Sequence, residues 1–156
     1  MQKIKRFPLI GGKRAYNSAI IDSFFFNRRS HYKVTVDGQV FCNEPVLFCT
    51  LCNGNYEGGG IKVAPFAKVD DGVLDIYRIK PISTFNFARL IGPYRQGEHV
   101  DNPEFHNYID FCQGTDVVIE CKKTMPFMVD GEVLSGKYFH VELLHHALDF
   151  VIPKGL

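Results

Sequence analysis

The residues best suited to chemistry lie in one stretch, residues 53–75. It begins with Asn53 and Gly54, continues through three successive glycines and reaches an acidic turn at Asp70 and Asp71. Successive glycines allow a backbone to approach a ligand or another chain segment closely. A carboxylate on a turn, together with backbone carbonyl oxygens, is a set of ligands that a hard cation accepts. The stretch therefore predicts a loop that binds a cation or a polar ligand, although the two aspartates are also compatible with solvated charges.

A second candidate is a carboxylate that follows a tight turn. Residues 34–40 and 127–133 echo each other, and each contains an Asp-Gly pair typical of a two-residue hairpin turn. The first turn is followed by Gln39 and the second by Glu132. Because a carboxylate accepts a proton and an amide does not, only the second turn can carry a general base. On local sequence alone, a plain hairpin is the favoured interpretation of both segments.

Three further patterns indicate structure rather than chemistry. Cys49 and Cys52 have the spacing of half a zinc site, but on a strand that spacing places the sulfurs on opposite faces, and no second ligand pair follows. Residues 131–138 nearly match a phosphate-binding P-loop. However, Tyr138 stands in place of the Ser or Thr, and strands rather than a helix follow, so no helix N-terminus completes the cradle. The tandem histidines at 145–146 fit a turn.

Composition indicates one globular domain and excludes two functional classes. The chain has 156 residues, of which 46% are hydrophobic, and 18 Lys and Arg balance 17 Asp and Glu. This near-neutral charge excludes a mainly electrostatic nucleic-acid binder and a charge-rich disordered segment. Five cysteines among apolar neighbours are typical of a reducing compartment. No secretory signal or bilayer-spanning run is visible, so we expect a cytoplasmic protein.

The hydrophobic periods predict a mainly β protein with two helices. A helix is expected over residues 13–26, where apolar residues recur every three to four positions, and a shorter helix over residues 83–91, ending before Gly92 and Pro93. Alternating patterns separated by turn signals are typical of an antiparallel sandwich or barrel. The expected strands are residues 32–36, 40–41, 46–52, 73–80, 105–112, 116–121, 127–129, 133–134, 138–143 and 148–152, and residues 94–104 are expected to form a loop.

Taken together, these motifs resemble the C-terminal domain of the diacylglycerol kinase and sphingosine kinase-like lipid kinases, particularly the bacterial members. The resemblance is carried by the glycine-rich run 52–60, by the Ala-Pro-x-Ala and Asp-Asp-Gly-x-Leu-Asp elements of residues 64–75, by Gly-x-His at 97–99 and by Asp-Gly-Glu at 130–132. Residues 11–16 are similar to the segment that joins the two domains of that family. The resemblance covers essentially the whole chain.

The resemblance implies an antiparallel β-sandwich with an N-terminal helix and one short inserted helix. Residues 1–30 would be a helical segment from the interdomain region, and residues 31–156 the C-terminal domain. The N-terminal domain of the family carries a Gly-Gly-Asp-Gly nucleotide-binding motif, which is absent here. We therefore expect the substrate- and metal-binding part of an ATP-dependent lipid kinase, inactive by itself because the nucleotide-binding domain is missing.

The resemblance also assigns roles to individual residues. It implies that Asp71 supplies a carboxylate to Mg²⁺ and that the backbone carbonyls of Lys68 and Val73 complete the ligands from that turn. It implies that Glu132 accepts the proton of the lipid hydroxyl, in keeping with a loose transition state that depends mainly on positioning. The residues expected to line the cleft are Asn53, Gly54 and Asp130.

The resemblance finally implies a set of partners. These are a lipid of the diacylglycerol or long-chain-base type, the missing nucleotide-binding domain and, through an apolar face near the first helix, a second copy of the chain. Contact with the inner membrane surface is expected to be peripheral at most. The alternative interpretation is a non-catalytic lipid-binding or interaction sandwich. A third is a kinase of a soluble substrate such as NAD, against which the triple glycine and the Ala-Pro-x-Ala element argue.

Overall fold

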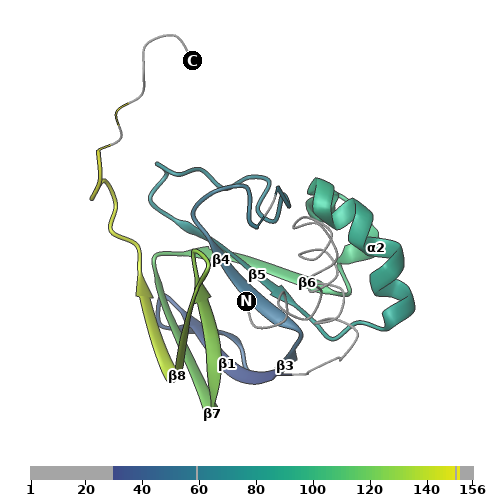
Figure 1. Cartoon of the computed structure of the whole chain (residues 1–156), viewed down its shortest axis with the longest axis horizontal. Coiled ribbons are helices and arrows are strands. Elements are labelled where there is room, and N and C mark those ends of the chain that lie inside the picture. Colours follow the sequence, from purple (N-terminus) through teal and green to yellow (C-terminus); the bar gives the residue numbers. More distant parts are fainter. Residues whose placement is uncertain (1–29, 59, 150, 152–156) are drawn as a thin grey trace, which may run out of the picture.

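Two antiparallel sheets face each other in the computed structural model, which describes residues 30–58, 60–149 and 151 (Figure 1). The larger sheet has the strand order β2-β1-β7-β8, with β3 pairing with the start of β1, and the smaller sheet has the order β4-β5-β6. The strands are β1 (Ser30–Val36), β2 (Gln39–Cys42), β3 (Pro45–Val46), β4 (Phe48–Cys52), β5 (Leu74–Ile79), β6 (Ile109–Gly114), β7 (Asp116–Val129) and β8 (Glu132–Glu142).

An apolar layer between the sheets holds the sandwich together. Every second residue over 32–36 of β1 is buried, and Val117 and Ile119 of β7 lie beside them. From the facing sheet, Leu74 and Ile76 of β5 complete the layer. Alternate burial of this kind is what a strand with one buried face requires. The mainly β, antiparallel sandwich predicted from the sequence is confirmed.

Strand geometry also explains the two cysteines with zinc-like spacing. Cys49 packs against the layer between the sheets, whereas Cys52 belongs to a second apolar cluster on the outer face of the smaller sheet. Burial raises the pKa of each thiol to about 12, so both stay protonated. The prediction that these cysteines are structural is confirmed, and within the described residues no three His, Cys, Asp or Glu side chains are grouped to hold a metal ion.

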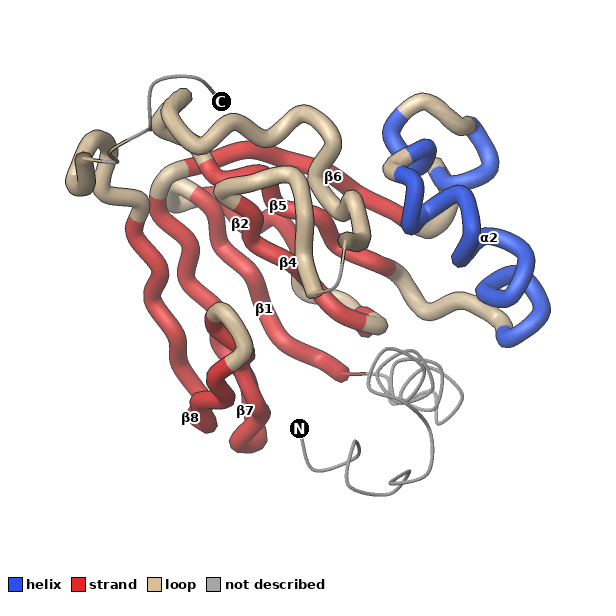
Figure 2. The backbone as a smooth tube through the Cα atoms, turned by 45° about the horizontal axis from the view of Figure 1, so that its top comes forward, coloured by secondary structure: helices blue, strands red, loops and turns tan. Residues whose placement is uncertain are grey.

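Helix α2 (Thr84–Gln96) lies against the outer face of the smaller sheet (Figures 1 and 2). It begins as predicted, because the Ser83 hydroxyl accepts a hydrogen bond from the backbone N–H of Asn86. The prediction that it ends before Gly92 and Pro93 is wrong. Pro93 lies inside the helix, and the left-handed cap is Gly97, whose N–H bonds the carbonyls of Pro93 and Tyr94.

Several predicted boundaries change for physical reasons. Residues 94–104, expected as a loop, contain the end of α2, the 3₁₀ helix η2 (Glu98–Val100) and the start of η3 (Pro103–Phe105), so β6 begins at Ile109 rather than at residue 105. The expected strand 46–52 is divided between β3 and β4. Residues 148, 149 and 151 have no strand partner and are not a strand. The helix predicted over residues 13–26 lies outside the described residues.

The β7–β8 hairpin folds back on itself. The sequence predicts a break in both strands, and the structure has two continuous strands with a bulge at that point: Glu120 pairs with Tyr138, whereas Met125 pairs with Gly136. Phe127 pairs with Leu134 beyond the bulge, and Phe139 pairs with Ile119 before it. The rings of Phe127 and Phe139 nevertheless stack with 4.8 Å between centroids. The distal half of the hairpin therefore lies over its proximal half.

None of the helices in the described part of the chain has the length and hydropathy that a membrane span requires.

Gly114 of β6 lies close to Val36 and Asp37 at the end of β1, in the facing sheet. A Cβ atom at this position would collide with Val36 Cγ1 and lie 2.7 Å from Asp37 Oδ2. We expect Gly114→Ala to lower the free energy of unfolding by about 1–3 kcal/mol, the usual cost of overpacking. Urea unfolding of the chain measures this, with Gly92→Ala as the control. A Cβ at Gly92 on α2 would meet no atom within 4 Å beyond its chain neighbours, while the following Pro93 offsets the helix propensity of alanine. Gly92→Ala should therefore change the free energy of unfolding by less than about 1 kcal/mol, and equal effects of both changes would contradict the packing described.

Candidate functional site

A tight turn that includes Gly58 and Gly60 follows β4. The backbone N–H of Glu57 bonds the carbonyl of Ile61 at 2.9 Å, and the N–H of Ile61 bonds the carbonyl of Glu57 at 3.0 Å. Gly60, inside this closed loop, has a φ of +92°, which side chains rarely tolerate. The glycines therefore fix the shape of the loop that begins at the predicted cleft residues Asn53 and Gly54.

Asn55 ties this loop to the Ala-Pro-x-Ala element. Its side-chain amide Nδ2 donates to three backbone carbonyls, those of Ala64, Pro65 and Ala67, at 3.0, 3.0 and 2.9 Å. These bonds pin residues 64–67 over the outer face of the smaller sheet, where Ala64 and Ala67 are buried. Sequence analysis did not identify Asn55. The only local signal is an amide side chain next to glycines and upstream of a proline loop.

The acidic turn leads directly into β5. Asp71 Oδ1 accepts a hydrogen bond from the backbone N–H of Val73 at 3.2 Å, and the side chain is exposed. The carbonyl of Asp70 accepts a hydrogen bond from His145 Nε2 at 3.3 Å. The predicted turn at residues 145–146 is confirmed, but the contact of His145 with this loop could not be read from the sequence. Gly72, which has a φ of +77°, leaves room for the ring of His145.

This turn offers oxygen ligands of the kind that Mg²⁺ takes. Asp71 is exposed and uses Oδ1 within the turn, while its other carboxylate oxygen makes no hydrogen bond among the described residues. Lys68 is exposed and Val73 is half-buried, and both belong to the same loop. One carboxylate with two carbonyls suits a cation that retains several waters, and it needs no cluster of acidic residues. The donor chemistry of this turn is thus of the kind that Mg²⁺ accepts, although within the described residues no three His, Cys, Asp or Glu side chains are grouped there.

The Asp-Gly hairpin predicted twice from the sequence is present twice. Asp37 and Asp130 both have a positive φ, of 46° and 44°, as the first residue of a tight turn. The two turns differ in their surroundings. Asp37 accepts hydrogen bonds from the backbone N–H groups of Asp116 and Thr115, which lower the pKa of its carboxyl group. In the described part of the chain Asp130 has no such partner, and Glu132 next to it is exposed as the first residue of β8.

The fold-back of the hairpin brings the second turn toward the glycine-rich loop. The carboxyl group of Glu57 accepts a hydrogen bond from Cys52 Sγ at 3.5 Å. Partial burial raises the pKa of this carboxyl group, and the charge of Asp130 raises it further. On the other side of the loop, Gly54 lies next to Val69, since a Cβ on Gly54 would contact Val69 Cγ1 at 3.7 Å. The structure thus places Gly54 against Val69 of the acidic loop, and among the described residues no hydrogen bond joins Asp130 or Glu132 to residues 53–58.

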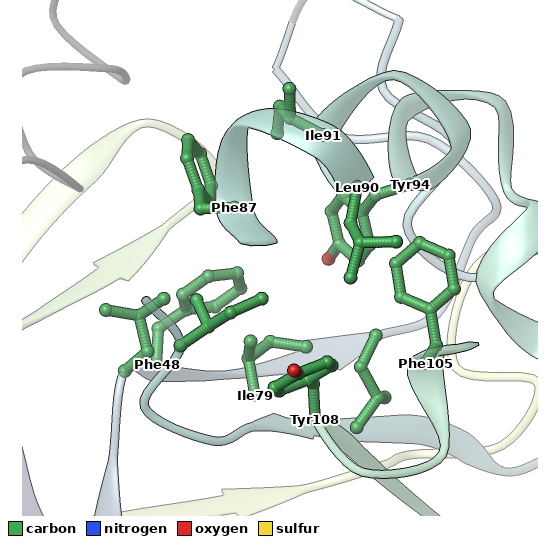
Figure 3. Close-up of a pocket in the computed structure, with 11 residues that line it drawn as sticks. Phe48, Ile79, Phe87, Leu90, Ile91, Tyr94, Phe105 and Tyr108 are labelled. Carbon is green, nitrogen blue, oxygen red and sulfur yellow. The ribbon is translucent and has the colours of Figure 1, made fainter. Parts of the chain in front are cut away.

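An apolar pocket lies between α2 and the smaller sheet (Figure 3). Its floor is one row of the sheet, because Phe48, Ile79 and Ile109 are direct neighbours across β4, β5 and β6. Its roof comes from α2 through residues spaced three or four apart, a period visible in the sequence but not linked there to a pocket. The lining residues are Leu47, Phe48, Ile79, Ile82, Phe87, Leu90, Ile91, Tyr94, Phe105, Tyr108 and Ile109.

His99 of the Gly-x-His element is part of the wall behind this pocket. It is 3% exposed, and its ring lies 4.7 Å from that of Tyr94 and 5.4 Å from that of Tyr77 between centroids. Burial lowers the pKa of His99, so the imidazole is neutral at pH 7. Gly97 allows close contact nearby, since a Cβ on it would lie 2.8 Å from Pro65 Cγ. The element therefore joins α2 to the Ala-Pro-x-Ala loop.

Comparison with known proteins places this architecture among lipid kinase domains. Residues 1–152 match the family model described as "YegS C-terminal NAD kinase beta sandwich-like domain". The chain is 30% identical over 114 residues to a protein of Chromohalobacter salexigens described as "Probable lipid kinase YegS-like". This match covers 72% of this chain and 35% of that protein. It is 28% identical over 130 residues to the diacylglycerol kinase of Bacillus subtilis, covering 81% of this chain and 40% of the relative.

A solved structure shows the same relationship. A diacylglycerol kinase from Bacillus anthracis strain Sterne superposes with a TM-score of 0.57 and 26% identity over 81% of this chain and 44% of that chain. The chain thus spans about 35–45% of the length of the relatives it matches. The matches support the lipid kinase resemblance found in the sequence.

Removing the donors of Asn55 tests the loop architecture. In Asn55→Asp, a carboxylate replaces an amide that donates to three carbonyls, so repulsion replaces attraction. We expect a loss of about 1–3 kcal/mol in the free energy of unfolding and faster hydrogen exchange over residues 61–67. The control is Asn107→Asp, because Asn107 is exposed. If the two variants unfold alike, Asn55 does not hold the loop.

Proposed function

This chain belongs to the family of YegS C-terminal NAD kinase beta sandwich-like domains, and we propose from that premise that it is the substrate-binding half of a lipid kinase. The reaction would transfer a phosphoryl group from ATP to the hydroxyl of a diacylglycerol-like lipid or a long-chain base. The observation that carries this proposal is the position of the apolar pocket. It lies between α2 and the smaller sheet, and α2 is tied to the chain that follows the glycine-rich loop, because the backbone N–H of Lys62 donates to the carbonyl of Arg95 at 3.1 Å.

The pocket supports a lipid substrate. Aliphatic and aromatic side chains of the sheet and of α2 line it on both sides, and burying hydrocarbon against such walls is worth about 0.8 kcal/mol for each methylene. A polar end of the same ligand would emerge near the glycine-rich loop. The relatives described as lipid and diacylglycerol kinases support the same substrate class.

The geometry of Glu132 suits a general base. Its carboxylate is exposed next to a rigid two-residue turn, so it can approach a substrate hydroxyl without loss of protein contacts. Phosphoryl transfer needs a positioned acceptor for the hydroxyl proton rather than a strongly basic one. In this proposal, the lipid hydroxyl donates its proton to Glu132 as its oxygen attacks the γ-phosphate of ATP and ADP leaves.

Mg²⁺ and the nucleotide complete the proposed site. Asp71 and the carbonyls of Lys68 and Val73 would hold Mg²⁺, which supplies electrostatic stabilisation when bound. ATP would be bound mainly by a nucleotide-binding half that this chain does not contain. Exposed apolar side chains flank the Glu132 turn, and we assign them to the interface with that half or with a second copy of the chain; they are Met128, Val129, Val133 and Leu134. Contact with the membrane would be peripheral.

Replacing Glu132 tests the catalytic assignment. In a chain joined to a nucleotide-binding half, Glu132→Gln keeps the shape of the side chain and removes the proton acceptor. We expect kcat to fall by roughly 10²–10⁴ with little change in KM for the lipid. The matched control is Gln39→Glu in the other Asp-Gly hairpin, which should leave kcat unchanged. Wild-type turnover in Glu132→Gln would reduce the element to an ordinary hairpin and would assign the proton acceptor to another group.

Replacing Asp71 tests the cation site separately. Asp71→Asn removes the only charged ligand proposed for this turn, so Mn²⁺ used as a probe should bind the 156-residue chain about tenfold or more weakly, as measured by calorimetry. In the joined chain, excess Mg²⁺ should partly restore activity to Asp71→Asn but not to Glu132→Gln. Asp70→Asn is the control, because among the described residues Asp70 makes a hydrogen bond through its backbone carbonyl and none through its side chain. Equal weakening by both aspartate variants would show only a general effect of charge.

A further inference from the structure

The acidic turn before β5 has few hydrogen bonds to the rest of the fold. Among the described residues, residues 68–72 make no backbone-to-backbone hydrogen bond, and the bond from the Val73 N–H to Asp71 Oδ1 stays within the turn. The hydrogen bond that reaches this turn from elsewhere in the described chain comes from His145, whose Nε2 lies 3.3 Å from the carbonyl oxygen of Asp70. Because a carbonyl oxygen only accepts, Nε2 carries the proton of this bond.

The ring of His145 meets the turn on both sides of Asp71. Its Nε2 bonds the residue before, Asp70, and its carbon atoms lie next to the residue after, Gly72, where an added Cβ would be 3.0 Å from His145 Cδ2. Gly72 has a φ of +77°, so glycine allows both the backbone conformation and the close approach of the ring. The ring therefore restrains the two neighbours of Asp71 and leaves the carboxylate itself exposed.

The sandwich sets the position of His145. The backbone N–H of Leu143 donates to the carbonyl of Thr115 at 2.8 Å. Thr115 is held in turn by the first Asp-Gly hairpin, because its N–H and its hydroxyl both donate to Asp37 Oδ1, at 3.0 and 3.1 Å. Figure 1 shows the chain leaving β8 at the end of the sandwich where the loop before β5 also lies. The chain is thus anchored two residues before His145.

The second histidine of the pair restrains the ring of the first. His146 has a φ of +55°, and in this turn conformation its ring lies 3.7 Å from that of His145 between centroids. The backbone N–H of Ala147 closes the turn on the carbonyl of Leu144 at 3.3 Å. A donor that is already restrained loses little conformational entropy when its hydrogen bond forms. The tandem histidines therefore present a fixed donor to the acidic turn.

Resting on the proposed cation site, we propose that His145 is a positioning residue for that site. Through Asp70 and Gly72 it holds the turn whose oxygen atoms would bind Mg²⁺, and it acts on the ion only through this turn. A loop that is restrained before binding gives a higher affinity, because less order has to be imposed when the ion binds. The site then includes a residue 75 positions further along the chain than Asp70.

Two variants of His145 separate its hydrogen bond from its ring. His145→Phe keeps a ring next to Gly72 and removes the donor, whereas His145→Gln keeps an amide donor of similar reach. Calorimetry with Mn²⁺ as the probe measures cation binding to the 156-residue chain. We expect His145→Phe to bind Mn²⁺ about three- to tenfold more weakly, the worth of one neutral hydrogen bond, and His145→Gln to recover most of this loss. The matched control is His31→Phe, which replaces an exposed histidine of β1 and should leave the affinity unchanged.

The same measurements distinguish the failure of this inference from the failure of the proposed cation site. If the wild-type chain does not bind Mn²⁺, or Asp71→Asn binds it as tightly as the wild type, the cation site fails and the role of His145 with it. If Asp71→Asn weakens Mn²⁺ binding but His145→Phe does not, only the assignment of His145 is overturned. The same holds if His145→Gln binds as weakly as His145→Phe, because His145 would then act as a ligand or through its ring.

Discussion

The burial of β5 on both faces is the constraint on which the rest of the structure depends. All six of its residues are buried, with Leu74 and Ile76 directed between the sheets and Tyr77 and Ile79 directed toward α2. Burying a charge is costly unless it is paired, and the terminal nitrogens of Arg78 form ion pairs with Glu44 and Asp110. The acidic turn directly precedes β5, and the last residue of β5, Ile79, belongs to the floor of the pocket. One rigid strand of about 17 Å therefore sets the spacing between them.

The elements that the sequence predicts well are those that depend on neighbours in the chain. The alternation over residues 32–36, the Asp-Gly turns and the Ser83 cap each arise from a local rule, and each is present. The elements missed depend on contacts between distant residues. Gly92 and Pro93 look like a helix end, but the helix continues because Leu90 and Tyr94 pack on the sheet and Gly97 offers a better cap. The stacking of Phe127 on Phe139 leaves no local trace either.

The residues of the candidate site also divide into those that a local motif identifies and those whose role depends on distant residues. The residues singled out by their motifs are exposed, Asp71 on a loop and Glu132 at the start of β8, so their chemistry is visible in their type and spacing. Asn55 is different, because an amide acquires a role only from the carbonyls that the fold places around it. The apolar period of α2 was likewise visible, but a helix face of this kind is equally typical of ordinary core packing.

The bulge in the β7–β8 hairpin has a consequence for how the cleft can change. Residues 121–124 of β7 stand opposite Lys137 alone, and the ladder resumes on both sides of them. The five pairs nearest the sandwich, from Asp116 to Glu120, do not depend on the length of this segment. Insertions or deletions at the bulge would thus lengthen or shorten the arm that carries Glu132 and leave the sandwich intact. Cleft width can evolve here independently of fold stability.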